Sequence, residues 1–259
     1  MIQQMQPLPL EVQQLTATYQ LGLPTAEFTP RLTASKWIFG ILLFLIGAGF
    51  IVFSFAASNS DATSQLVLLL IGLAVVALGF SPFIATYLQR GLHVYVCPNG
   101  LVYVNGSKSD VIRWDQIEAV WAQVTRRYYN GVYAGTTHLY TVRRADGATF
   151  KFNDKFHKVG DLGTMIERES SRQLLPKAIA AYNFGAPVVF GKLVVSQQGV
   201  SNGKEMLPWS QVKGIRVNRG VVTVSKEGKW LNWANIPVSR TPNIFVFMAL
   251  VNYIVNGRR

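Results

Sequence analysis

The sequence contains few of the residues from which enzyme and metal sites are usually built. Its 259 residues include one cysteine, Cys97, and three histidines, His93, His138 and His157. One cysteine excludes an intrachain disulfide and fits a reducing compartment. The histidines stand apart, and no Cys-x-x-Cys or His-x-x-x-His spacing is present. Neither a glycine-rich phosphate loop nor a nucleophile elbow is found. We therefore predict no metal, no cofactor and no enzyme, with Cys97 as a packing residue.

Charge is also scarce, and acidic residues are scarcest. Only 15% of residues are charged, whereas 49% are hydrophobic, which indicates a membrane part. Lys and Arg number 25 against 13 Asp and Glu, a net charge of +12. From Arg90 onward the ratio is 23 to 10. Such an excess favours an anionic partner, whether a nucleic acid, an acidic protein or an anionic lipid surface.

Two long runs without a charged residue lie near the N-terminus. They cover Trp37 to Ala57 and Leu66 to Tyr87, each close to the ~20 residues that a bilayer-spanning helix needs. We predict a two-helix transmembrane hairpin over 36–88; buried core helices are the alternative. Arg31, Lys36 and Arg90 flank the runs, and the connector has no Lys or Arg. The positive-inside rule then predicts a multi-pass protein of the inner (cell) membrane, with both termini cytoplasmic.

Glycines recur at seven-residue spacing in both runs. Gly40 and Gly47 share one helix face, as do Gly72 and Gly79. Small residues on facing helices allow close packing, although glycine is also common in transmembrane helices generally. Before them, residues 1–35 form an N-terminal cytoplasmic segment. A short amphipathic helix over 9–20 and a disordered tail are both compatible with its composition.

From Leu92 onward the pattern changes to strands and turns. Asn99-Gly100 and Asp146-Gly147 predict hairpins, and the spacing of Val159, Leu162 and Ile166 predicts a helix that Pro176 ends. The order then starts again. Hairpins are predicted at Gln198-Gly199 and Glu227-Gly228, followed by a helix capped by Thr241. Units over 92–182 and 183–257 therefore repeat one plan.

A short phrase marks each repeat. "IRWDQIEAV" (112–120) and "LPWSQVKGI" (207–215) both place a Trp before a turn and a new strand. Asp115 and Ser210 suit a turn. We interpret each Trp as a core anchor at a sheet corner; a ligand platform is the other interpretation.

These units resemble the pleckstrin-homology-like (PH-like) fold. The segments that carry the resemblance are "VCPNGLVYV", "VIRWDQIEAV", "VVSQQGVSN" and "MLPWSQVKGI". The whole chain is similar to uncharacterised bacterial membrane proteins with an N-terminal transmembrane hairpin and PH-like domains. The resemblance implies an α+β membrane protein in which two tandem PH-like units, each a bent antiparallel sheet or barrel with a C-terminal helix, follow the hairpin. Lipid-binding PH domains carry Lys and Arg in the first hairpin loop. Here those loops are "CPNGL" and "SQQGV", so no phosphoinositide-binding residue can be transferred.

One stretch of the first unit has no counterpart in the second. Residues 125–138, "TRRYYNGVYAGTTH", correspond to the much shorter "VNRG". This insertion could bind an acidic partner or lie on lipid headgroups; an extended hairpin whose tyrosines pack locally is the alternative. The candidate binding residues are Arg126, Arg127, Tyr128, Tyr129, Tyr133, Arg143 and Arg144.

Together these observations predict a membrane-anchored, non-enzymatic binding or scaffold module. Its cytoplasmic units would engage a protein partner or the anionic inner leaflet. The alternatives are a membrane-tethered nucleic-acid-binding protein, which lacks a recognition motif here, and an enzyme whose site is not visible in sequence. The oligomeric state is left open.

Overall fold

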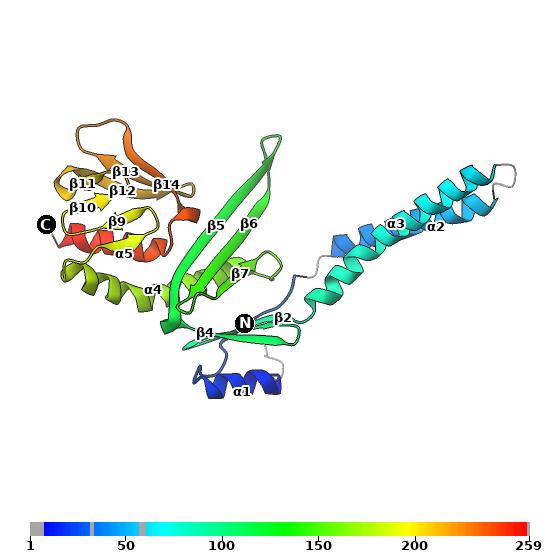
Figure 1. Cartoon of the computed structure of the whole chain (residues 1–259), viewed down its shortest axis with the longest axis horizontal. Coiled ribbons are helices and arrows are strands. Elements are labelled where there is room, and N and C mark those ends of the chain that lie inside the picture. The colour runs from blue at the N-terminus through cyan, green and yellow to red at the C-terminus, as the bar shows by residue number, and fades with distance from the viewer. Residues whose placement is uncertain (1–7, 32–33, 57–60, 258–259) are drawn as a thin grey trace. The chain divides into compact units, whose positions relative to one another are not determined.

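The computed structural model describes residues 8–31, 34–56 and 61–257 of this α+β chain. Its contacts divide it into two units. One comprises residues 1–28, 94–103 and 110–259, and is called the body here; the other comprises residues 29–93 and 104–109. The elements are drawn in Figure 1.

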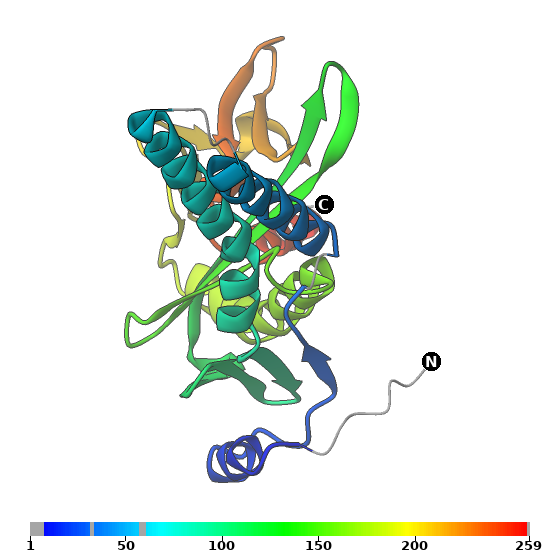
Figure 2. The same ribbon diagram turned by 90° about the vertical axis from the view of Figure 1, so that its right-hand side faces the viewer.

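Two long apolar helices form most of the second unit. Helix α2 spans Ala34–Ala56 and α3 spans Ala62–Gln89, and both are long and apolar enough to cross a membrane. Figures 1 and 2 show them side by side. The buried residues of α2 are Gly40, Gly47 and Ser54, and those of α3 are Gly72 and Gly79. The glycine faces predicted from the sequence are therefore the faces on which the helices meet.

The segment before these helices belongs to the body. Helix α1 (Leu10–Thr18) forms where an amphipathic helix was one of two alternatives, and it buries Val12 and Thr16. Strand β1 (Ala26–Phe28) then pairs antiparallel with β2 (Leu92–Cys97). Phe28 is the register partner of Val94, so the helix pair is inserted between two neighbouring strands of one sheet. The sequence did not predict strand β1, because three residues are too few for a pattern.

The first half of the body contains two antiparallel sheets. A four-stranded sheet has the order β1-β2-β3-β4, and a three-stranded sheet the order β5-β6-β7. A single 3₁₀ turn, η1, joins β4 to β5, and helix α4 follows β7. The bounds are β3 Gly100–Asn105, β4 Lys108–Arg113, η1 Trp114–Gln116, β5 Ile117–Tyr129, β6 Val132–Arg144, β7 Thr149–Asn153 and α4 Val159–Asn183.

The second half follows the same order of elements. Its sheets are β8-β9-β10-β11 and β12-β13-β14, with the turn η2 between them and helix α5 last. The bounds are β8 Val188–Phe190, β9 Leu193–Val195, β10 Gly199–Ser201, β11 Met206–Pro208, η2 Trp209–Gln211, β12 Val212–Asn218, β13 Val221–Lys226, β14 Asn232–Pro237, η3 Val238–Arg240 and α5 Ile244–Asn256.

The tryptophans of the two repeated segments, Trp114 and Trp209, make equivalent contacts in their respective halves. Trp114 and Trp209 are 2% and 8% exposed. The indole Nε1 of Trp114 donates to the carbonyl of Cys97 at 3.2 Å, and that of Trp209 donates to the carbonyl of Ser196 at 2.8 Å. Each ring is thus buried while its polar atom is satisfied, as a core anchor requires.

Helix α4 contributes to both halves of the body. Its first turns bury Val159, Leu162 and Ile166, as the spacing predicted. The prediction that Pro176 ends the helix was wrong, because α4 continues to Asn183. Its later turns place Ala178 and Tyr182 in the core of the second half, so packing offsets the backbone hydrogen bond that proline removes.

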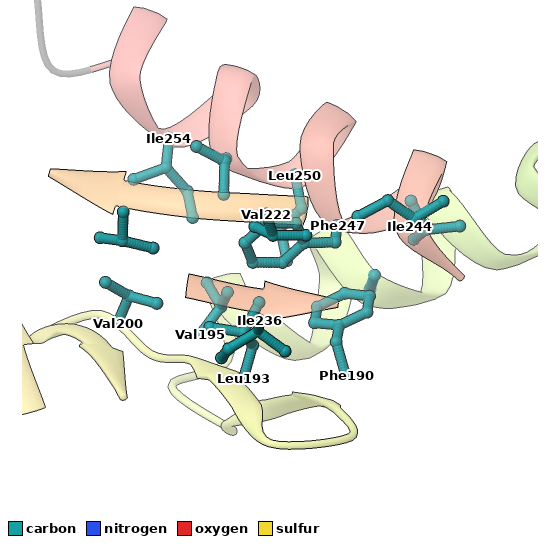
Figure 3. Close-up of a cluster of buried hydrophobic side chains, with 14 of the residues drawn as sticks. Phe190, Leu193, Val195, Val200, Val222, Ile236, Ile244, Phe247, Leu250 and Ile254 are labelled. Atoms are coloured by element: carbon teal, nitrogen blue, oxygen red, sulfur yellow. The ribbon is translucent and has the colours of Figure 1, made fainter. Parts of the chain in front are cut away.

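Helix α5 covers the second core on one side. Phe247 and Leu250 are fully buried, and the rings of Phe190 and Phe247 meet edge to face at 5.3 Å (Figure 3). The helix begins at Ile244 and its N-cap residue is Asn243, two residues later than the Thr241 cap that we predicted. Asn243 precedes it with φ of 54°, while the hydroxyl of Thr241 donates to the carbonyl of Pro237.

Candidate functional site

Strands β5 and β6 extend well beyond the rest of their sheet. They pair along their whole length, whereas β7 accompanies β6 only from Arg143 to Leu139. Residues 124–138 therefore form a two-stranded ribbon, called the arm here, which projects from the body in Figures 1 and 2. In the second half, β13 is paired with β14 up to its first residue, Val221, so that sheet has no arm.

The tip of the arm is a tight turn at Asn130 and Gly131. Both have positive φ, 47° and 80°, as the mirror-image hairpin turns require, and an Asn-Gly pair adopts this conformation readily. The flanking residues Tyr129 and Val132 are register partners. Local sequence thus determines where the arm ends.

Aromatic side chains cluster at this tip and remain exposed. Tyr128 and Tyr133 are register partners whose rings meet at 6.0 Å, and the hydroxyl groups of Tyr133 and Thr136 are 2.7 Å apart. The rings nevertheless stay 61% and 57% exposed, and Tyr129 is 74% exposed. Tyr128 and Tyr133 therefore pack on each other, and all three tyrosines stay exposed.

Arginines lie directly beneath the aromatic tip. Arg126 and Arg127 are exposed, and neither forms an ion pair with any residue that the structure describes. No acidic residue occurs between Glu118 and Asp146. Arg126 and Arg127 directly precede Tyr128 and Tyr129 on β5, and the pairing with β6 is irregular between Arg127 and Tyr128. The two cations are therefore adjacent in sequence to the aromatic tip.

Arg143 and Arg144 lie apart from this group, at the base of the sheet. Arg143 donates to both carboxylate oxygens of Glu118, at 2.9 and 2.8 Å, and lies 5.2 Å above the ring of Trp121. Arg144 pairs with Asp146 and donates to the carbonyl of Val111 at 2.7 Å. The structure therefore brings five of the seven predicted residues together on the arm and gives the other two internal partners.

The sequence analysis did not predict a second exposed aromatic site. In the loop between β13 and β14, Trp230 is 91% exposed and Leu231 is 62% exposed, next to Lys229. Figures 1 and 2 show this loop, in orange, at the same end of the body as the tip of the arm. The signal was available in the sequence, since a Lys-Trp-Leu run directly follows the turn at Glu227-Gly228.

Titratable groups also gather where α4 packs on the inner face of β5 and β6. The ring of His138 meets the carboxylate of Asp154 at 3.1 Å, and Tyr140 stacks beside it. Burial raises the pKa of Tyr140 to about 12 and that of Glu167 to about 7. Burial likewise raises the pKa of Cys97 to about 11, which keeps it a neutral thiol. Among the described residues, no three His, Cys, Asp or Glu side chains are grouped to hold a metal.

The fold and the arm thus describe an α+β protein with two apolar helices of membrane-spanning length. The chain belongs to DUF6585, a family of unknown function, and the match covers residues 1–259. No curated protein and no solved structure matches it.

Proposed function

We propose that this protein is a membrane-anchored, non-enzymatic binding module whose two PH-like units stand at the cytoplasmic face of the inner membrane. In this proposal the arm contacts the headgroups of anionic lipids. The observation that carries it is the composition of the arm, in which exposed tyrosines surround two arginines that have no acidic neighbour.

Several features support the membrane anchor. Core helices are mostly buried, but only 17% of the apolar window of α2 and 11% of that of α3 are buried. Because β1 and β2 are paired, the chain leaves the body after Phe28 and rejoins it at Val94 in one place. This supports a hairpin whose two ends lie on one side of the membrane, as the flanking basic residues predict.

The sheet topology supports two PH-like units. Each half has a four-stranded sheet, a Trp-bearing turn, a three-stranded sheet and a closing helix. A PH-like unit needs the same arrangement of two antiparallel sheets and a C-terminal helix. The fold alone does not define a ligand, so the function is argued from the arm.

The physical reason for lipid contact is the pairing of charge with aromatic surface. Tyr and Trp side chains are favoured at the level of the headgroups, where one end of the ring is apolar and the other wet. Each basic residue held near an anionic leaflet gains on the order of 1 kcal/mol, screened by salt. Lys229 and Trp230 supply the same combination in the β13–β14 loop.

A single fluorescent probe at the tip tests the lipid contact. Cys97 is buried and unique, so a Cys97→Ala background allows Val132→Cys to be labelled with a polarity-sensitive dye. The full chain is placed in nanodiscs of phosphatidylcholine, with or without phosphatidylglycerol. We expect the emission to shift to the blue only with phosphatidylglycerol, and the shift to shrink from 50 to 500 mM salt.

Two controls define the outcome. The double variant Arg126→Gln, Arg127→Gln should remove the blue shift. A dye attached at Ser210→Cys, a nearly isosteric substitution at an exposed position, should show the same emission in both nanodiscs. Identical emission from Val132→Cys in both nanodiscs would refute the lipid contact. Reporter fusions at residues 62 and 259 test the topology separately, with opposite sides of the membrane expected.

A further inference from the structure

The outer edge of strand β5 is occupied by a residue from the second half of the chain. The amide of Asn243 donates to the carbonyl of Val120 at 2.8 Å, and the amide of Val120 donates to Asn243 Oδ1 at 2.8 Å. Asn243 Nδ2 also donates to the carbonyl of Glu118 at 3.0 Å. Asn243 therefore satisfies the edge at Glu118 and Val120 as a neighbouring strand would.

Strand β12 holds the corresponding place in the second half. Ile215 follows Trp209 by six residues, as Val120 follows Trp114. The strands also share an irregularity, between Ile117 and Ala119 in β5 and between Val212 and Gly214 in β12. Within the described part of the chain, β12 has one strand neighbour, β13, and no residue covers its other edge as Asn243 covers β5.

A groove of about 510 Å³ lies beside that open edge, between the start of β12 and helix α5. Its surface is mainly apolar, with Ile215 on the strand side and Met248 and Val255 on the helix side. Lys213 also lines it, Arg216 follows on the same strand, and Arg219 lies in the turn after that strand. No acidic residue occurs from 206 to 226. The groove thus combines an unpaired strand edge, an apolar floor and a cationic border.

We propose that this groove binds an extended, acidic segment of a partner protein that adds to β12 as a further strand. The backbone of the segment pairs with Lys213 and Ile215, as Asn243 pairs with Glu118 and Val120. Its apolar side chains alternate into the groove, and its carboxylates face Lys213 and Arg216. The site is distinct from the arm and needs no anionic lipid.

A second copy of this chain fits the groove less well. The segment that corresponds to Asn243 in the first half ends at Lys158, which also precedes a helix with positive φ, 53° against 54° for Asn243. That segment contains Lys155 and Lys158, which β12 would repel, and its carboxylate, Asp154, is already bound to His138. Charge complementarity therefore favours an acidic partner.

Peptide binding to the full chain in phosphatidylcholine nanodiscs tests the proposal. The probes are three fluorescein-labelled hexapeptides in which valine alternates with aspartate, lysine or asparagine, measured by fluorescence anisotropy. We expect the aspartate peptide to bind at least tenfold more tightly than the lysine peptide. Methylation of its backbone amides at alternate positions should weaken binding at least tenfold, because strand addition needs those N–H groups.

Two variants locate the binding. Lys213→Glu reverses a charge beside the groove and Met248→Trp fills the groove, so each should weaken binding of the aspartate peptide about tenfold. Lys204→Glu, an equal charge change in the exposed loop between β10 and β11, should not weaken it. The proposal is overturned if no peptide binds, if the lysine peptide binds equally, or if N-methylation has no effect. It is also overturned if sedimentation shows a dimer that Met248→Trp dissociates, since the occupant is then a second copy.

Discussion

Gly47 and Gly72 face each other across α2 and α3 at backbone contact. A Cβ atom on Gly47 would lie 2.8 Å from the carbonyl oxygen of Gly72, and one on Gly72 would lie 3.0 Å from the carbonyl oxygen of Gly47. Gly40 and Gly79 repeat the contact two turns away, at 2.9 and 3.0 Å. Any side chain at these four positions would separate the helices, so the pair depends on glycine for its close approach.

Replacement of Gly47 by leucine should loosen this helix pair. The side chain would meet the backbone of Val76 as well as Gly72, and overpacking of this kind costs about 1–3 kcal/mol. We expect a lower melting temperature of the full chain in detergent, followed by circular dichroism at 222 nm. Gly49→Leu is the matched control, because a Cβ at Gly49 meets nothing within 4 Å. Equal melting temperatures for the two variants would contradict the packing described here.

A second pair of glycines tests how α4 packs on the first half. A Cβ on Gly163 would overlap the ring of Tyr140, whereas one on Gly160 would lie 3.6 Å from His138, an ordinary contact. Gly163→Ala should therefore destabilise the body by about 1–3 kcal/mol. Gly160→Ala should be neutral or gain up to about 1 kcal/mol from helix propensity. Guanidinium denaturation of the full chain in detergent, followed by tryptophan fluorescence, measures both.

Removal of the indole hydrogen bond of Trp114 should lower the free energy of unfolding. Trp114→Phe keeps an aromatic ring but leaves the carbonyl of Cys97 without its side-chain donor, and we expect a loss of about 1–3 kcal/mol. Trp209→Phe should behave alike, because Trp209 donates to Ser196 in the same way. Trp230→Phe, at a 91% exposed position, should change the free energy of unfolding by less than about 0.5 kcal/mol. Equal losses in the free energy of unfolding for Trp230→Phe, Trp114→Phe and Trp209→Phe would disprove the anchoring role of Trp114 and Trp209.

The raised pKa of Glu167 should make the stability of the protein depend on pH. Burial raises its folded-state pKa to about 7 from an ordinary value of 4.5. Between these values the unfolded chain loses the proton first, so the free energy of unfolding should fall as pH rises from 4.5 to 7 and then level off. The fall attributable to this group is on the order of 1–3 kcal/mol, because the side chain is only partly buried. Glu167→Gln should flatten the profile over that window, whereas Glu205→Gln, at an exposed position, should leave it unchanged. A profile that Glu167→Gln does not alter would show that this carboxyl group titrates normally.

Local chemistry was sufficient where a feature depends on neighbours in sequence. The hairpin at Asp146-Gly147 forms as predicted, and Gly147 has a φ of 88°. The hairpin expected at Asn99-Gly100 also forms, but its turn lies at residues 98–99 and Gly100 begins β3. The apolar helices and their glycine faces were also predictable, because length, hydropathy and seven-residue spacing are properties of the sequence. The same holds for the arm, which ends at the Asn130-Gly131 turn between exposed tyrosines.

Other features depend on residues far apart in the chain and had no local signal. The sequence pattern predicted that α4 ends at Pro176. The helix continues because Ala178 and Tyr182 pack into the core of the second half. The sequence pattern likewise placed the N-cap of α5 at Thr241, but Asn243 is the residue that precedes the helix, with positive φ and a bond to the edge of β5.

The sequence by itself determined the local elements of this protein: its turns, its apolar helices, the two tryptophan phrases and the cationic, aromatic arm. Only the tertiary structure decided that β1 pairs with β2 across an inserted helix pair, and that Asn243 pairs with the edge of β5 at Glu118 and Val120 while no described residue pairs in this way with β12. The physical reason is that turn and helix preferences act between neighbouring residues. The pairing of strand edges instead depends on which distant backbone groups the fold brings within hydrogen-bond distance.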